Sequence, residues 1–101
     1  MKNLTRITAV TALAAIVPAF VGAATLDRKL VARARVTPQQ AQTIALKARP
    51  GKIVDAEIER EGGGSGLRYS FDVAYGGATY EVGVDANTGV VLENAREGKA
   101  D

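Results

Sequence analysis

Apolar residues recur at every second position in two neighbouring stretches of the chain. They occupy alternate places from Leu67 to Tyr75 and again from Ala78 to Val84. Because successive side chains of a strand point to opposite sides, each stretch predicts a β-strand with one apolar and one polar face. The pair Gly76–Gly77 can take the positive φ of a tight turn, so the two strands are expected to form an antiparallel hairpin. The residues expected on the polar face are Arg68, Ser70, Asp72, Glu81 and Asp85.

A further strand is expected over residues 52–60, where apolar and acidic residues alternate. The apolar face is predicted to hold Val54, Ala56 and Ile58, and the acidic face Asp55, Glu57 and Glu59.

The glycine-rich stretch Glu61–Gly66 joins this strand to the hairpin and predicts a long, mobile loop. A phosphate-binding P-loop is excluded, because the stretch lacks a Lys-Ser or Lys-Thr ending and is followed by a strand instead of a helix.

One helix is predicted before the strands, from Pro38 to Ala48. Thr37 is the expected N-cap, Pro38 suits the first helical position, and Gln40 completes a capping box. The helix is expected to end before Pro50–Gly51, because the residue preceding a proline avoids helical geometry. Its apolar face is small enough to lie close to a sheet and comprises Ala41, Ile44, Ala45 and Ala48.

The stretch from Asp85 to Gly89 predicts a tight turn into a short final strand, since Asp and Asn side chains accept backbone N–H groups and Gly takes the left-handed region. It is not a calcium-binding EF-hand loop, because Gly89 is in the fifth position and Arg96 is in the twelfth. Residues 95–101 are expected to form a charged tail.

The beginning of the chain has the pattern of a secretory signal peptide. A basic start, Met1–Arg6, precedes the apolar stretch Ile7–Phe20 and the small residues Val21–Ala23. Cleavage is expected between Ala23 and Ala24. The apolar stretch is too short to span a membrane, and no cysteine is present to carry a lipid anchor. A periplasmic or secreted bacterial protein with no stable membrane anchor after cleavage is therefore expected.

Charge is unevenly distributed along the rest of the chain. Seven basic residues and one acid lie between Ala24 and Lys52, whereas acids predominate from Ile53 onward. Residues 24–35 form a basic leader, for which a flexible tether, a short helix and a short strand all remain open. No aromatic residue lies among its arginines, so nucleic acid is not an expected partner.

The ordered set of motifs resembles a PepSY domain. The resemblance runs from Val36–Ala41 through Pro50–Gly51 and the acidic strand Val54–Glu59 to the closing stretch Tyr80–Val91. It covers residues 36–94. It implies an α+β fold in which one N-terminal helix packs on an antiparallel sheet of three to four strands. PepSY domains occur in propeptides of secreted metallopeptidases and in small exported proteins, and the resemblance implies peptidase restraint or protein binding without catalytic residues.

Composition also argues against catalysis. The chain has no His and no Cys, which removes the usual general base, thiol nucleophiles and most transition-metal ligands. We expect no catalytic residue, no metal ligand and no cofactor. The prediction is a protein-binding module with Asp55, Glu57 and Glu59 as its candidate contact surface and an unknown protein, a peptidase among the candidates, as its partner. The alternative is a structural or sensory accessory that forms a homodimer and weakly binds cations or a membrane surface.

Overall fold

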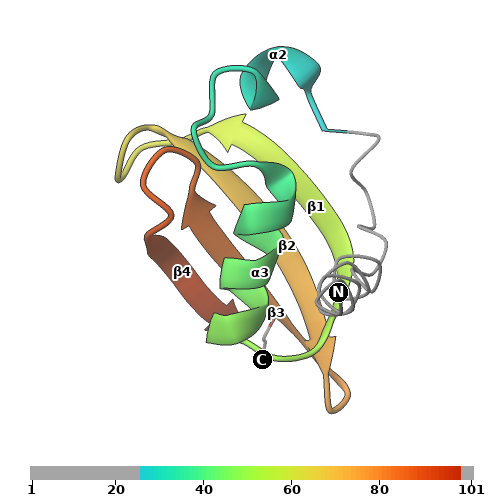
Figure 1. The fold of residues 1–101 in the computed structure, drawn as a ribbon. Helices are drawn as coiled ribbons and strands as arrows, with labels where there is room; N and C mark the ends of the chain where they lie inside the picture. The colour runs from blue at the N-terminus through green and yellow to red at the C-terminus, as the bar shows by residue number, and fades with distance from the viewer. Residues whose placement is uncertain (1–25, 99–101) are drawn as a thin grey trace, which may run out of the picture.

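The computed structural model describes residues 26–98, in which two helices cover one face of a four-stranded sheet (Figure 1). The strands follow one another across the sheet in chain order, and every neighbouring pair is antiparallel. This confirms the predicted α+β class. The elements are α2 (Arg28–Val31), α3 (Pro38–Ala48), β1 (Lys52–Arg60), β2 (Leu67–Tyr75), β3 (Ala78–Asp85) and β4 (Val91–Arg96).

The predicted signal peptide and its cleavage point between Ala23 and Ala24 lie outside the described residues. Within residues 26–98, no helix is long and apolar enough to cross a membrane.

Helix α3 has the predicted bounds because its first turn is capped as the sequence indicates. The hydroxyl of Thr37 accepts a 3.1 Å hydrogen bond from the backbone N–H of Gln40. The side chain of Gln40 in turn accepts one of 2.9 Å from the backbone N–H of Thr37. Ala41 and Ala45 are completely buried against the sheet, so their small side chains let the helix lie close to it.

The core lies between α3 and the two central strands. Tyr69, Phe71, Val73, Val82 and Val84 have no exposed surface, and burial of each such side chain contributes about 1.5–3 kcal/mol. The hydroxyl of Tyr69 donates a 2.7 Å hydrogen bond to the carbonyl of Val36, which ties β2 to the residue before the helix cap.

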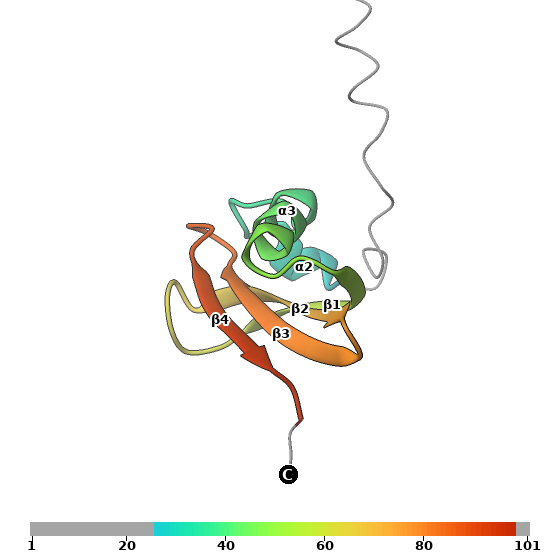
Figure 2. The ribbon, with the colours of Figure 1, turned by 90° about the horizontal axis from the view of Figure 1, so that it is seen from below.

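The described part of the basic leader, residues 26–35, contains a short helix that packs on the core, which corresponds to the second of the three alternatives. Asp27 caps α2 by accepting hydrogen bonds from the N–H groups of the second and third residues after it. Leu26 is buried and Leu30 packs on the core. The end of the leader is bound to the β3–β4 turn, because Arg35 and Val36 both donate N–H groups to the carbonyl of Ala86. Figure 2 shows α2 on the same side of the sheet as α3.

A β-bulge corrects the prediction for the first strand. Ile53 pairs with Val73 and Asp55 pairs with Asp72, so Val54 is an extra residue in β1. The insertion interrupts the alternation of faces. As a result Ile53 is buried, whereas Val54 is 48% exposed and the prediction that it shares the apolar face was wrong. Ala56 and Ile58 are buried as predicted.

The last strand is longer than expected, because β4 continues to Arg96. Ala95 pairs with Glu81 and Arg96 with Tyr80, so two residues assigned to the charged tail belong to the sheet. Hydrogen bonds to the end of α3 hold this extension in place. The side chain of Asn94 donates to the carbonyl of Ala48 and accepts a 3.0 Å hydrogen bond from Arg49.

The glycine-rich loop has more fixed contacts than its composition indicates. The N–H of Ser65 donates a 2.6 Å hydrogen bond to Asp85, and the Ser65 hydroxyl donates one of 2.9 Å to the same carboxylate. Asp85 was predicted on an exposed polar face, but it has no exposed surface. The N–H groups of Asn87 and Thr88 also bind it, as expected for the predicted turn. The carboxylate of Asp85 therefore binds both the β1–β2 loop and the β3–β4 turn at this end of the sheet.

Candidate functional site: an acidic open face of the sheet

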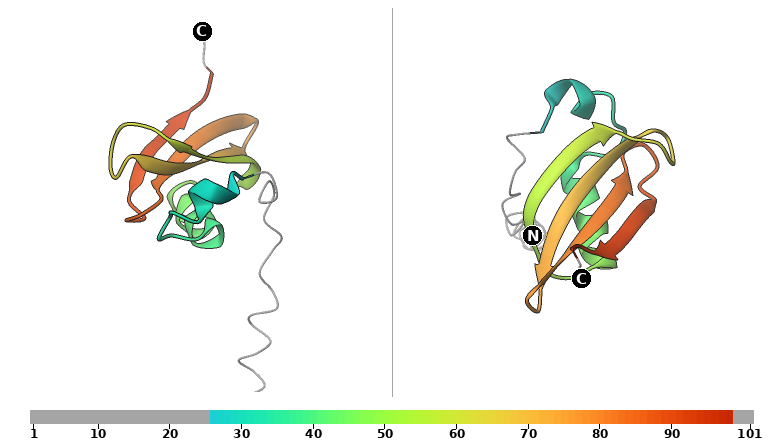
Figure 3. Two further views of the ribbon diagram at one scale, coloured as in Figure 1. Left: turned by 90° about the horizontal axis from the view of Figure 1, so that it is seen from above. Right: turned by 180° about the vertical axis from the view of Figure 1, so that it is seen from behind.

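One face of the sheet is left uncovered by the described part of the chain. Both helices lie on the opposite side, as the view from behind makes clear (Figure 3). We call this uncovered side the open face. Strand pairing, together with the closeness of Glu97 to Asp72, gives its solvent-accessible acids as Asp55, Glu57, Glu59, Asp72, Glu81, Glu93 and Glu97.

Strand pairing places these acids in rows across the sheet. Asp55 pairs with Asp72, and Asp72 pairs with Glu81, so three carboxylates from three strands are neighbours. Like charges directly opposite one another in a sheet repel. The cations on the same face are Arg68 and, at the corner of the sheet, Lys52. The open face is therefore strongly acidic.

The carboxylates crowd most closely at one point. Single oxygen atoms of Asp72, Glu81 and Glu97 lie within 4.8 Å of one another. Burial, the charge of Glu97 and a hydrogen bond to it raise the pKa of Asp72 to about 6, and Asp55 and Glu57 add to the effect. The pKa of Glu81 is also raised, chiefly by burial. This part of the face is under electrostatic strain near neutral pH.

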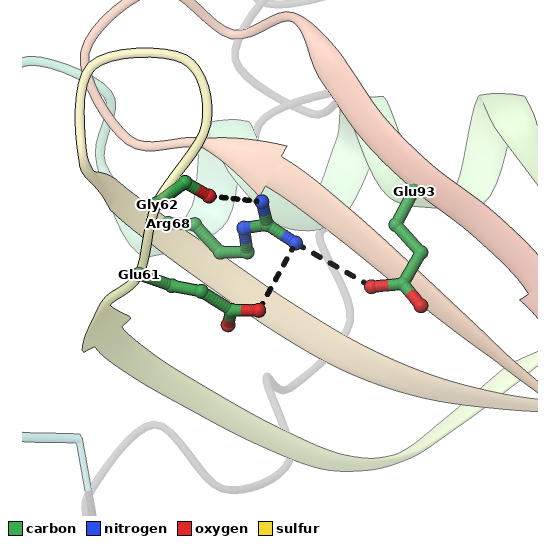
Figure 4. Close-up of polar contacts among 4 residues, drawn as sticks. All are labelled: Glu61, Gly62, Arg68 and Glu93. Carbon is green, nitrogen blue, oxygen red and sulfur yellow. Dashed lines mark hydrogen bonds and ion pairs between the residues drawn. The ribbon is translucent and has the colours of Figure 1, made fainter.

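Arg68 relieves the repulsion at the other end of the face (Figure 4). Its guanidinium lies 3.4 Å from Glu93 and 3.8 Å from Glu61, and it donates a hydrogen bond to the carbonyl of Gly62. The side chain reaches Glu93 by crossing Gly83, where an added Cβ would lie 3.2 Å from the Arg68 Cδ. Glycine at this position thus lets the arginine lie flat on the sheet. Arg68 is almost buried, which the predicted exposed polar face did not anticipate.

Comparison with family models gives a match over residues 35–94, to PepSY, described as the peptidase propeptide and YPEB domain. The match spans more than half of the chain. This chain belongs to the PepSY family. No curated protein and no solved structure matches the chain. The match begins at the end of the leader and includes every strand except the last two residues of β4, so the open face of this PepSY domain is almost wholly within it.

The three acids predicted as a contact surface do share a face of the PepSY domain. Asp55 and Glu57 are exposed on β1, which is an edge strand, and Glu59 is half-buried. Burial, followed by a hydrogen bond and charge repulsion from Glu61, raises the pKa of Glu59. Asp55 and Glu57 also border a hollow of about 360 Å³ at the sheet edge, whose other lining residues are Leu26, Asp27, Ala56 and Ile58.

The sequence did not predict that these three acids lie on the same face as Asp72, Glu81 and Glu97. Asp72 and Glu81 were placed on a polar strand face, but their distance from Asp55 depends on how β1 pairs with β2. The bulge at Val54 sets that pairing, and periodicity alone gave no sign of it. Glu97 follows a strand that was predicted to end earlier. The alternation of acids within each strand indicated that each strand has an acidic side. The order of the strands in the sheet, which brings these acidic sides together, could not be predicted from it.

Proposed function

We propose that this PepSY protein is an exported, non-catalytic module that binds another protein and restrains or modulates a peptidase outside the cytoplasm. The observation that carries the proposal is the open face, where seven carboxylates share one uncovered side of the sheet with two cations. The family supports the link to peptidases, since its description names a peptidase propeptide.

Electrostatic complementarity supports a basic docking surface on the partner. Complementary potentials speed association and select among partners. In this protein burial, followed by the negative charges of Glu97, Asp55 and Glu57, raises the pKa of Asp72, so part of that rise comes from repulsion within the unbound face. A basic surface of the partner would relieve that repulsion on binding.

The β1 edge is an accessible part of this surface, because Asp55 and Glu57 are exposed on it. Asp55 and Glu57 lie beside a hollow large enough for the end of a lysine or arginine side chain. An edge strand also presents unpaired backbone groups that a partner strand can use. The proposed contact therefore combines a charged anchor with an available strand edge.

The test is a pull-down from the periplasmic and secreted fractions of the host, with the full chain as the host processes it. We expect a peptidase to co-purify and its activity to fall when the purified PepSY protein is added. The variants Asp55→Asn and Glu57→Gln should weaken inhibition about tenfold together. Gln39→Lys on exposed α3 changes net charge in the same direction and serves as the matched control. Equal effects of the control, or recovery of the bait alone, would count against the proposal.

A second candidate function is a self-associating accessory that responds to cations. The specific observation in its favour is the convergence of Asp72, Glu81 and Glu97, since carboxylate oxygens are the ligands that calcium and magnesium prefer. Light scattering should then show a dimer, and calcium should raise the melting temperature of the unaltered protein but not of Asp72→Asn. A monomer with no calcium effect would eliminate this candidate.

A further inference from the structure

A second hollow, of about 240 Å³, lies at the end of the sheet away from the β2–β3 hairpin. Four segments meet there: the end of the leader, the end of β1, the β1–β2 loop with the start of β2, and the β3–β4 turn (Figure 1). The residues that line it are Arg33, Arg60, Ser65, Gly66, Leu67 and Asn87.

Hydrogen bonds fix the walls of this hollow. The backbone N–H of Arg35 donates a 3.2 Å hydrogen bond to the side-chain carbonyl of Asn87, which places the leader against the β3–β4 turn. The side-chain amide of Asn87 donates 3.0 Å to the hydroxyl of Ser65, and that hydroxyl donates to the buried Asp85. These hydrogen bonds connect the lining residues Asn87 and Ser65 to the buried core. At the rim, Gly66 has a φ of +91° and no atom lies within 4 Å of where a Cβ would be, so the hollow is open there.

The lining residues include two cations and no acid, and the one carboxylate in contact with them is that of the buried Asp85, which accepts a hydrogen bond from Ser65. It includes Arg33 and Arg60, two exposed arginines from separate segments of the chain. Within residues 26–98 neither guanidinium has an ion pair or a side-chain hydrogen bond, whereas Arg68 has both. One hydrogen of the Asn87 amide is used by Ser65, and the second has no acceptor among the described residues. The lining therefore offers two planar cationic forks and one neutral donor.

We propose that this hollow binds a phosphate group through Arg33 and Arg60. A guanidinium binds phosphate with two parallel hydrogen bonds, and two guanidiniums match the charge of a phosphate monoester. A tetrahedral phosphate can present separate pairs of oxygens to forks that approach from different elements, which a planar carboxylate does less well. The phosphate comes from a small soluble molecule or from a lipid headgroup. This site is independent of the acidic open face and of its peptidase partner.

Nuclear magnetic resonance titration of the full chain, as the host processes it, tests the proposal. Inorganic phosphate is added at constant ionic strength, with sodium chloride replaced as phosphate rises. We expect saturable shifts centred on the amide groups of Gly66 and Asn87. Arg33→Gln and Arg60→Gln should each weaken binding at least about tenfold, since each removes charged hydrogen bonds. Arg33→Lys keeps the charge but loses the planar fork, so it should also weaken binding.

Arg28→Gln is the matched control, because Arg28 is an exposed cation of α2 outside the hollow. A second arm uses phosphatidylcholine vesicles with and without phosphatidic acid. Binding to phosphatidic acid that depends on Arg33 and Arg60 identifies a lipid source, and binding to inorganic phosphate alone identifies a soluble one. Equal losses in the control, or no saturable binding in either arm, would overturn the proposal. The spectrum of each variant reports directly whether it is folded.

Discussion

The hydroxyl of Ser65 donates a 2.9 Å hydrogen bond to the carboxylate of Asp85, joining two loops that are 20 residues apart in the chain. Asp85 accepts further hydrogen bonds from three backbone N–H groups, those of Ser65, Asn87 and Thr88. Although burial alone would raise the pKa of Asp85, these hydrogen bonds together lower it to about 2. A buried anion thus organises the end of the sheet where the hollow lined by Arg33 and Arg60 lies.

Asp85→Asn is expected to lower the free energy of unfolding by about 2–4 kcal/mol, because an amide can no longer accept all of these hydrogen bonds with a full charge. Urea denaturation at pH 7 measures the effect. Ser65→Ala removes one donor and should cost less, about 1 kcal/mol. If Asp85→Asn were as stable as the unaltered protein, Asp85 would not organise these loops.

The lowered pKa of Asp85 also predicts how the free energy of unfolding changes with acid. Its pKa is lower in the folded protein than its ordinary value of 3.8, so its contribution is present above pH 4. That contribution should be lost as pH falls from about 4 toward 2. Urea denaturation across this range should show a steep loss of stability that is weaker in Asp85→Asn. An identical pH profile for the two proteins would contradict this assignment.

The raised pKa of Asp72 predicts the opposite pH dependence of stability between about pH 4 and pH 6. Its folded pKa of about 6 exceeds the ordinary 3.8, so the folded state holds a proton that the unfolded state releases. Stability should therefore fall as pH rises from about 4 through 6. Asp72→Asn should stabilise the protein at pH 7 by about 1 kcal/mol, a figure reduced for solvent screening, and should flatten the profile. A destabilised variant would show that the carboxylates do not repel one another.

The bulge in β1 predicts that two adjacent apolar residues differ greatly in their importance. Ile53→Ala should lower the free energy of unfolding by about 2–4 kcal/mol, because Ile53 is buried. Val54→Ala should change it by less than about 0.5 kcal/mol, because Val54 lies at the surface. Thermal denaturation of both variants compares them. Equal costs would mean that the strand pairs without the bulge.

The capping box of α3 can be tested by a double-mutant cycle. Thr37→Ala should cost about 1 kcal/mol, because the N–H of Gln40 loses its acceptor. Gln40→Ala should cost less, and the double variant should cost less than the two changes added together, since the two side chains act on one helix end. Strict additivity would indicate that the two bonds act independently.

Features that depend on neighbouring residues were predictable from the sequence. The capping box, the small apolar face and Pro50 set the bounds of α3, because helix ends depend on local hydrogen bonding and local sterics. The hairpin from β2 to β3 follows from alternation and a glycine turn, and the turn after Asp85 from side-chain hydrogen bonds within three residues. The family resemblance over residues 36–94 corresponds to the family match over 35–94.

Only the tertiary structure decided which distant residues meet. The bulge at Val54, the extension of β4 to Arg96 and the burial of Asp85 all depend on pairing between strands, and no local pattern records such pairing. The same holds for both candidate surfaces. Asp55 and Glu97 share an acidic face, and Arg33 and Arg60 line one hollow, because strand order brings them together. Alternation along one strand shows which side a residue takes, but its neighbours on that side come from other strands and loops.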